Sequence, residues 1–251
     1  MTADAGRAVA IVTGGSRGIG AAASRLLAQR GWAVAVNYVA ADDAAHALVA
    51  GIVASGGRAT AIKADVTDAG AVVELFARCD AELGRLRGLV NCAGLVGMRG
   101  RYVDVPDAVV RRVFDVNLFG AMACIREAIP RMSLQSGGQG GAIVNVSSGL
   151  STSGAPNVEI HYAVSKAALN CLTLGLAQEL AGEGIRVNTV SPGATRTEMP
   201  DAAVLEAAAA EIPIGRVAEP EEIGEAIAWL LSNQASYVAG AYLRVGGGKP
   251  G

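Results

Sequence analysis

The sequence predicts an α/β fold with a doubly wound parallel sheet of seven strands and helices on both of its faces. Short β-branched runs alternate along the chain with longer helical patterns, which is the βαβ arrangement of a parallel sheet. The strand runs are almost continuously apolar, as expected for strands that helices cover on both faces. A chain of 251 residues, 51% of them hydrophobic, can bury one large core of this kind.

Each strand run precedes or follows a helix-like segment. In chain order the seven runs are AVAIVT, AVAVNY, RATAIKA, LRGLVN, GAIVNVSS, IRVNTVS and AYLRV. The glycine-rich stretch QSGGQGG before the fifth run is expected to be a loop. No linker divides the chain, so residues 1–251 are expected to form a single domain. Between about residues 194 and 215, the segment AAVLEAAAAEIP predicts a small helical substrate lid.

Composition excludes several classes of function. The formal net charge of -2 gives no global attraction for nucleic acid or an anionic membrane, so a small-molecule partner is expected. No apolar run is long enough to span a bilayer and the N-terminus lacks a signal-peptide pattern, so the expected location is cytoplasmic. The four cysteines are widely spaced, which predicts small buried hydrophobes and no metal site.

The first strand leads directly into a glycine-rich turn and then into the helical pattern AAASRLLAQR. Glycines in such a turn let backbone amides approach a pyrophosphate at the positive end of the helix dipole. The spacing T-G-x-x-x-G-x-G differs from G-x-G-x-x-G, and a turn of this kind can also serve only to pack a helix against a sheet. Its place at the first strand-to-helix turn favours nucleotide binding. The residues expected to bind the cofactor here are Gly14, Ser16, Arg17, Gly18, Ile19 and Gly20.

The end of the second strand bears on the choice of cofactor. NAD-binding proteins commonly carry an acid there for the ribose 2′-hydroxyl, whereas this chain has Asn37 and Tyr38. Arg17 adds a permanent cation whose geometry matches a phosphate. We therefore expect NADP(H) to be preferred over NAD(H), with Asn37 in the cofactor site, and Asn37→Asp to reverse the preference. The alternative is that Arg17 is only a solvated loop charge.

Tyr162 and Lys166 lie four residues apart in HYAVSKAALNCLTLGLAQEL, a segment whose apolar spacing predicts a helix. They therefore share one face of that helix. An ammonium group one turn from a phenol favours the phenolate, so Lys166 is expected to lower the pKa of Tyr162. This pattern predicts a general acid/base.

Several motifs in this order resemble the short-chain dehydrogenase/reductase family, and the resemblance covers nearly the whole chain. The resemblance is carried by the glycine-rich turn, Asn91-Cys92-Ala93-Gly94, Asn117, Ser148, Tyr162, Lys166 and Ser191-Pro192-Gly193. It implies a Rossmann-type fold and an oxidoreductase acting on an alcohol or ketone. Within the family the chain is similar to NADP-preferring single-domain members, including 3-oxoacyl carrier-protein reductases and glucose-dehydrogenase-like enzymes. One fold hosts many functions, so the substrate stays open.

The resemblance also implies catalytic roles for Asn117, Ser148, Tyr162 and Lys166. Ser148 and Tyr162 would bind the substrate oxygen, and Lys166 would also hold the nicotinamide ribose. Asn117 would kink its helix and hold a water that links Lys166 to solvent, although it could instead make a local helix hydrogen bond. Ser147 is the rival to Ser148. His161 is expected to face a pocket rim or solvent and to take no part.

The same resemblance places the adenine ring at Asp65 and Val66 and the adenosine ribose beside residues 91–94. Asp65 could instead be only a turn or helix-cap acid. Cys92 departs from the usual N-N-A-G. The cofactor-binding residues implied beyond the glycine-rich turn and Asn37 are Asp65, Val66, Asn91, Ala93, Gly94, Tyr162, Lys166, Pro192, Gly193, Thr195 and Thr197.

Two rival functions and an oligomeric state are also considered. A catalytically idle nucleotide-binding regulator or scaffold of the same fold is the rival function, and an intact serine, tyrosine and lysine set argues against it. A dehydratase or epimerase is disfavoured because the C-terminal region is short. The final helical segment EEIGEAIAWLLS and the strand AYLRV carry more apolar surface than one sheet edge needs, which predicts a homotetramer.

Overall fold

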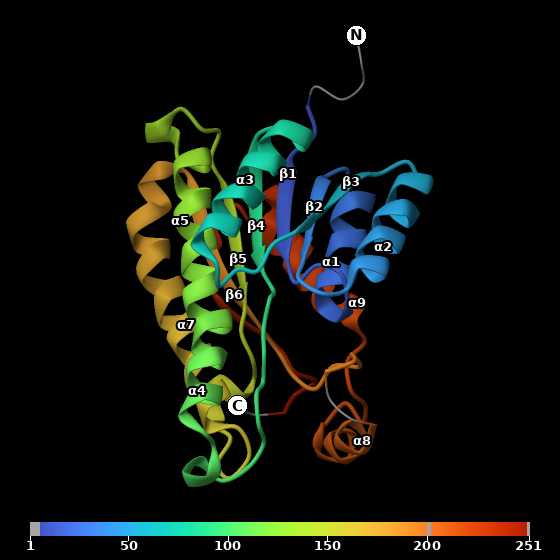
Figure 1. The fold of residues 1–251 in the computed structure, drawn as a ribbon, viewed down its shortest axis with the longest axis vertical. Coiled ribbons are helices and arrows are strands. Elements are labelled where there is room, and N and C mark those ends of the chain that lie inside the picture. Colours follow the sequence, from blue (N-terminus) through green and yellow to red (C-terminus); the bar gives the residue numbers. More distant parts are fainter. Residues whose placement is uncertain (1–5, 200–201, 250–251) are drawn as a thin grey trace.

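Seven parallel strands form the centre of the molecule in the order β3-β2-β1-β4-β5-β6-β7 (Figure 1). The structure is a computed structural model and describes residues 6–199 and 202–249. The fold prediction is confirmed, and each predicted run coincides with a strand. The strands are β1 Val9–Thr13, β2 Ala33–Tyr38, β3 Arg58–Lys63, β4 Leu86–Asn91, β5 Gly141–Val146, β6 Ile185–Pro192 and β7 Tyr242–Val245.

Helices cover both faces of this sheet (Figure 1). Helices α3, α5 and α7 pack on one face and α1, α2 and α9 on the other. The remaining helices lie near the carboxyl ends of the strands (Figure 1). The helices are α1 Gly18–Gln29, α2 Asp42–Ala54, α3 Ala69–Leu83, α4 Asp107–Phe114, α5 Ala121–Met132, α6 Leu150–Ser153, α7 Ile160–Leu180, α8 Ala202–Glu211 and α9 Pro220–Leu231.

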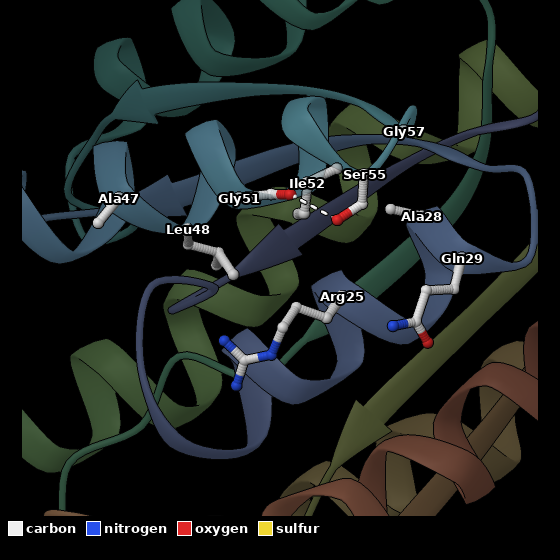
Figure 2. Close-up of a pocket in the computed structure, with 9 residues that line it drawn as sticks. All are labelled: Arg25, Ala28, Gln29, Ala47, Leu48, Gly51, Ile52, Ser55 and Gly57. Carbon is white, nitrogen blue, oxygen red and sulfur yellow. Dashed lines mark hydrogen bonds between the residues drawn. The ribbon is translucent and has the colours of Figure 1, made fainter.

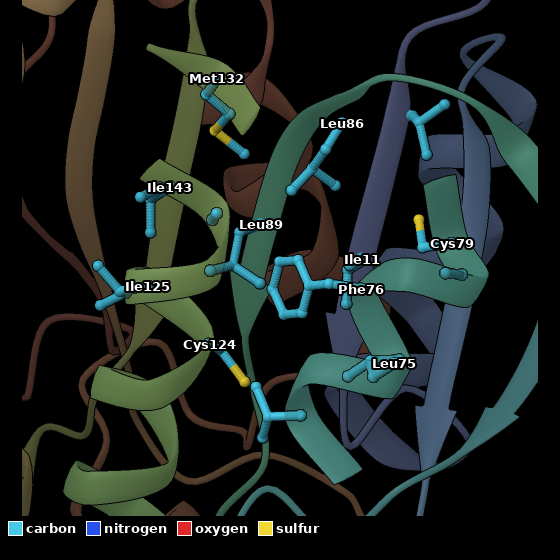
Figure 3. Close-up of a cluster of buried hydrophobic side chains, with 14 of the residues drawn as sticks. Ile11, Leu75, Phe76, Cys79, Leu86, Leu89, Cys124, Ile125, Met132 and Ile143 are labelled. Carbon is cyan, nitrogen blue, oxygen red and sulfur yellow. The ribbon is translucent and has the colours of Figure 1, made fainter. Parts of the chain in front are cut away.

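Alternation along β1 explains why its sequence is continuously apolar. Val9 and Ile11 belong to the core between the sheet and α3, α5 and α7, whereas Ala10 and Val12 belong to the core on the opposite face. Figure 3 shows the first of these cores, with Phe76 at its centre. Both sets of side chains are out of contact with water, so a polar residue at any of these positions would face a buried core.

Two of the four cysteines lie in this core (Figure 3). Cys79 and Cys124 are fully buried, and burial raises the pKa of each thiol to about 12. They act as small hydrophobes, as the sequence predicts. Cys171 is exposed, so the prediction of a buried thiol is wrong for this residue. Cys92 is half-buried, so there the prediction is met only in part.

Helix α8 lies apart from the sheet and packs on a small cluster of its own, formed by Leu205, Ile212 and Val217 (Figure 1). A parallel bridge between Thr195 and Ala218 joins the two ends of this excursion. The predicted lid at about 194–215 falls here, although residues 200 and 201 lie outside the described residues. Its opening and closing stay a prediction. Across the described ranges, none of the helices is long and apolar enough to cross a membrane.

Candidate active site at the carboxyl ends of the strands

The turn between β1 and α1 is a backbone cradle that larger residues would fill. Gly14 and Gly18 have φ angles of 60° and 49°, where side chains are disfavoured. A Cβ at Gly20 would lie 2.3 Å from the carbonyl oxygen of Gly14. No side chain among the described residues caps the start of α1, and its first turn carries no acid. Free N–H groups at a positive helix end suit an anion such as a phosphate.

This cradle lies at the point where the strand order reverses, between β1 and β4. In doubly wound sheets, ligands bind at such a switch point. The hydroxyl of Thr13 accepts hydrogen bonds from the N–H groups of Cys92 and Ala93, each at 3.1 Å, and so joins the two strand ends. Asn91 donates to Asn145 at 2.9 Å. The backbone at Cys92 and Ala93 is thus held to Thr13, and burial raises the pKa of the Cys92 thiol to about 11.

The side chain of Asn37 is buried at the end of β2. Its side chain is 1% exposed and donates to the carbonyl oxygens of Ile62 and Ala64, while its Oδ1 accepts from Gly14 N–H at 3.4 Å. Asn37 therefore supports the glycine-rich turn, and its contact with a bound ribose stays a prediction. The sequence of β2 does not reveal this bonding, because Ile62 lies in β3 and Ala64 just after it. Val39, 49% exposed, is the first side chain after β2 that reaches solvent well.

Asp65 forms the turn that the sequence analysis left as an alternative. Its Oδ1 accepts from the N–H and hydroxyl of Thr67 at 2.9 and 2.8 Å, and its Oδ2 pairs with Arg112 at 3.1 Å. Partial burial opposes ionisation, but these bonds outweigh it and lower the pKa of Asp65. Val66 is buried against Gly120, where a Cβ would lie 2.7 Å from its side chain. Contact of either residue with adenine stays a prediction.

The end of β6 reaches the same cradle from the other side. Pro192 is the last residue of β6, and a Cβ at Gly193 would lie 2.9 Å from Gly246. A Cβ at Gly18 would lie 3.0 Å from the side chain of Thr197, so Thr197 stands at the start of α1. The hydroxyl of Thr195 donates to the carbonyl oxygen of Gly193 at 3.0 Å and is turned inward. Thr195 thus bonds to the local backbone, whereas contact of Thr197 with a bound phosphate stays a prediction.

The structure brings Ser148, Tyr162 and Lys166 together. The hydroxyl of Ser148 lies close enough to the Tyr162 phenol to lower its pKa, and the Nζ of Lys166 lies 5.8 Å from the centre of the Tyr162 ring. Ser147 points elsewhere, because its buried hydroxyl donates to the carbonyl oxygen of Lys166 at 3.1 Å. Of the two serines, Ser148 is therefore the one beside the phenol.

Burial controls the ionisation of Tyr162 and Lys166. It raises the pKa of Tyr162 to about 12, which the Ser148 hydroxyl partly offsets, and it lowers the pKa of Lys166 to about 8. The Nζ of Lys166 donates to the carbonyl oxygen of Val146 at 2.8 Å rather than to the phenol. The expectation that Lys166 lowers the phenol pKa is therefore not met in this structure. Spacing along a helix places two groups on one face but does not reveal how deeply that face is buried from solvent.

Asn117 belongs to a π-helical stretch, Asp115–Gly120, between α4 and α5. Its Oδ1 accepts from Leu95 N–H at 2.7 Å, and its Nδ2 donates to the Leu95 carbonyl at 2.9 Å and to Ser165 at 3.0 Å. The alternative of a local helix hydrogen bond is wrong. A Cβ at Gly94 would lie 3.5 Å from Lys166 Nζ and 3.6 Å from Asn117 Oδ1. Both groups thus flank the backbone at Gly94, and a water between them stays a prediction.

Near Tyr162, the expected position of His161 is wrong, and Glu159 and Arg99 were not expected from the sequence. His161 is 2% exposed, with Nε2 3.0 Å from the Val96 carbonyl oxygen, so it does not line a rim or face solvent. Glu159 is 3% exposed and pairs with Arg99. The sequence points to Glu159 only as an acid three residues before Tyr162. Its partner Arg99 lies 60 positions earlier, and nothing in the sequence links the two.

Neither the cofactor cradle nor Tyr162 lines the cavity between α1 and α2 (Figure 2). That cavity has a volume of about 230 Å³ and includes Arg25 and Gln29 beside apolar groups. It contains none of the predicted site residues. Within the described part of the chain, no group of three or more His, Cys, Asp or Glu side chains could hold a metal ion.

Comparison with known proteins agrees with this geometry. The family model described as Enoyl-(Acyl carrier protein) reductase matches residues 14–249. A short-chain dehydrogenase/reductase from Serratia marcescens has a solved structure with a TM-score of 0.91 and 36% identity, covering 97% of this chain and 98% of that one. The chain belongs to the short-chain dehydrogenase/reductase family. It is therefore an oxidoreductase by family.

Two further relatives bear on chemistry. The cis-4-hydroxycyclohexanecarboxylate dehydrogenase of Sinomonas cyclohexanicum is 44% identical over 245 residues, covering 96% of this chain and 95% of the relative. A blue fluorescent protein from a metagenomic library, solved in complex with NADPH, has a TM-score of 0.91 and 35% identity, covering 99% of this chain and 100% of that one. The chain thus matches both over nearly its full length.

Proposed function

We propose that this protein transfers a hydride between NADP(H) and an alcohol or ketone. The observation that carries the proposal is the convergence of Ser148, Tyr162 and Lys166 beside the glycine cradle at the switch point of the sheet. The open cradle of Gly14, Gly18 and the uncapped start of α1 fits a dinucleotide pyrophosphate.

Four side chains of the site have defined tasks in this reaction. The nicotinamide, when bound, gives or accepts the hydride. Ser148 and Tyr162 hydrogen-bond the substrate oxygen and stabilise negative charge that develops on it. Tyr162 gives up its phenolic proton to that oxygen in reduction and takes one back in oxidation. Lys166 holds ribose hydroxyls and favours the phenolate once its ammonium leaves the Val146 carbonyl, and Asn117 connects this region to solvent.

NADP(H) is the cofactor that the surface near the cradle favours. Arg17 is exposed and its guanidinium makes no hydrogen bond or ion pair with other described residues, so this group is available to a 2′-phosphate. The solvent-facing residue after β2 is the uncharged Val39. Fluorescence titration should give a lower dissociation constant for NADPH than for NADH, and Arg17→Gln should remove the difference. Arg25→Gln, on α1 and beside the cavity of Figure 2, is the matched control. Equal constants in the parent protein would contradict the assignment.

A panel of carbonyl compounds with NADPH absorbance as the readout tests the reaction. The panel should include 3-oxoacyl thioesters, aldoses and 4-oxocyclohexanecarboxylate, the ketone that corresponds to the substrate named for the Sinomonas relative. Turnover of any member, lost in Tyr162→Phe, supports the proposal. Tight NADPH binding without turnover across the panel and its alcohols would favour the idle regulator or scaffold. Absence of binding to either nicotinamide cofactor would overturn both.

A homotetramer in the cytoplasm completes the proposal. β7 is the edge strand of the sheet, and Trp229, Tyr237 and Tyr242 on or beside α9 and β7 are 36%, 102% and 38% exposed. Apolar groups of this size on a sheet edge suit a contact between copies. Light scattering at micromolar concentration should give a mass near four chains, and a single-chain mass would contradict the assembly.

A further inference from the structure

A buried carboxylate lies beside the proposed acid/base. Glu159 precedes the first residue of α7 and is only 3% exposed. The Nε of Arg99, from the loop after β4, lies 2.5 Å from its Oε1. Burying an ionised carboxylate is costly unless it is paired, and the side chain of Arg99, which is 42% exposed, supplies that pairing. The buried position of Glu159 thus depends on Arg99.

The ion pair is one of three contacts between the same two segments. Gly100 N–H donates to the Val158 carbonyl at 2.9 Å, and Nε2 of His161 lies 3.0 Å from the Val96 carbonyl oxygen. These contacts fasten residues 96–100 to residues 158–161. The loop just before this second segment holds two non-glycine residues, at 155 and 157, with φ angles of 46° and 63°. Such backbone persists only where surrounding contacts over-determine it, and it clusters at functional sites.

The position of Glu159 also gives it an electrostatic effect. Glu159 is the N-cap residue of α7 and Tyr162 lies in its first turn, so an anion at Glu159 opposes the phenolate. After burial and the Ser148 hydroxyl, the charge of Glu159 is the next influence on Tyr162, and it raises the pKa of the phenol. The other titratable neighbours are Lys166 and His161 on α7 and Cys92 on the loop after β4.

We propose that the Arg99–Glu159 ion pair is a positioning element for the reaction. It fixes the loop after β4 against the first turn of α7 and keeps a compensated negative charge beside the phenol of Tyr162. The arrangement sets the pH at which the phenol exchanges its proton with substrate. This inference rests on the proposed hydride transfer and deepens it.

Three variants test the pair through the pH dependence of alcohol oxidation, which requires the phenolate. The alcohol is the one that corresponds to the best ketone of the panel. Glu159→Gln removes the anion and leaves Arg99 unopposed, so the rising limb of kcat/KM should move about one pH unit toward acid. Arg99→Met leaves the anion unopposed and should move the limb toward alkali. The double variant removes both charges and should lie between Glu159→Gln and the parent.

The order is the decisive observation. From alkaline to acid it should be Arg99→Met, parent, double variant and Glu159→Gln. A purely structural contact would lower activity in all three variants without shifting the limb, and that outcome, or any other order, overturns the proposal. Arg78→Met breaks the Arg78–Glu82 pair on α3 and is the matched control, since the side chains of Arg78 and Arg99 are 43% and 42% exposed.

Two measurements keep the test decisive. If Arg99→Met does not fold, as judged by circular dichroism, the isosteric Glu159→Gln and the charge-free double variant still fix the order relative to the parent. If the parent turns over nothing, absorbance titration of the phenols near 295 nm, with Tyr162→Phe subtracted, reports the Tyr162 ionisation directly. Glu159→Gln must lower that midpoint. An unchanged midpoint defeats this inference, whereas absent turnover alone counts only against the proposed function.

Discussion

Replacing Lys166 with methionine should stabilise the cofactor-free protein while abolishing its activity. Lys166 is 3% exposed, and burial lowers its pKa from 10.5 to about 8. A shift of that size corresponds to about 3 kcal/mol of destabilisation while the amine is protonated in both states. Methionine fills a similar volume without charge but loses the hydrogen bond to the Val146 carbonyl, worth about 1 kcal/mol. The expected net gain at pH 7 is about 2 kcal/mol.

The pH dependence of this gain identifies its cause. Because the folded-state pKa lies below the unfolded one, the cost of Lys166 is fully present below about pH 8 and fades as the pH rises toward 10.5. Urea unfolding at pH 7 and pH 10 should therefore show a gain for Lys166→Met at pH 7 that disappears at pH 10. Lys63→Met, at an exposed and ion-paired lysine, should show no such gain. A variant that is less stable than the parent at pH 7, or equally stabilised at both pH values, would refute the reasoning.

Three further substitutions follow from the geometry. Tyr162→Phe should abolish single-turnover hydride transfer and leave NADPH affinity nearly intact, because only the acid/base hydroxyl is removed; transfer at the parent rate would disprove the assignment. Gly20→Ala should abolish NADPH binding in fluorescence titration, since its Cβ would lie 2.3 Å from Gly14 O, whereas Gly51→Ala, with nothing within 4 Å, should raise Tm slightly. Asn37→Asp should lower the free energy of unfolding by about 2 kcal/mol or more, since a buried carboxylate would replace an amide donor. If that variant were instead stable and NADH-preferring, the buried position of Asn37 would be wrong.

The fold could be predicted because the strand runs are governed by local burial. The run VAIVT has no polar side chain except its last, and the structure buries all five residues between two helical layers. The π-helical stretch Asp115–Gly120 could not be predicted in the same way. Its apolar spacing resembles that of an α-helix, and Asn117 within it bonds to Leu95, 22 residues away, which the local sequence does not reveal.

The site was predictable where function depends on sequence order and not where it depends on contacts between distant segments. Ser148, Tyr162 and Lys166 follow one strand or lie on one helix, so their proximity follows from topology. The buried bonding of Asn37 could not be predicted, because its partners lie in β3 and just after it. The lowered pKa of Lys166 could not be predicted, because its amine is buried among three separate segments: the end of β5 at Val146, the loop at Gly94 and α7 itself.

The distribution of buried polar groups favours an enzyme over an idle scaffold. Asn117, Glu159, His161 and Lys166 are each at most 3% exposed and lie around the first turns of α7. Each costs free energy to bury, and the Nδ1 of His161 has no hydrogen-bond partner in the described structure. A protein that only held a nucleotide would be more stable with apolar residues at several of these positions, as Lys166→Met is expected to show. Catalysis explains why these polar groups are buried beside Tyr162 despite the free energy that their burial costs. A phenol that must gain and lose a proton needs fixed, desolvated partners.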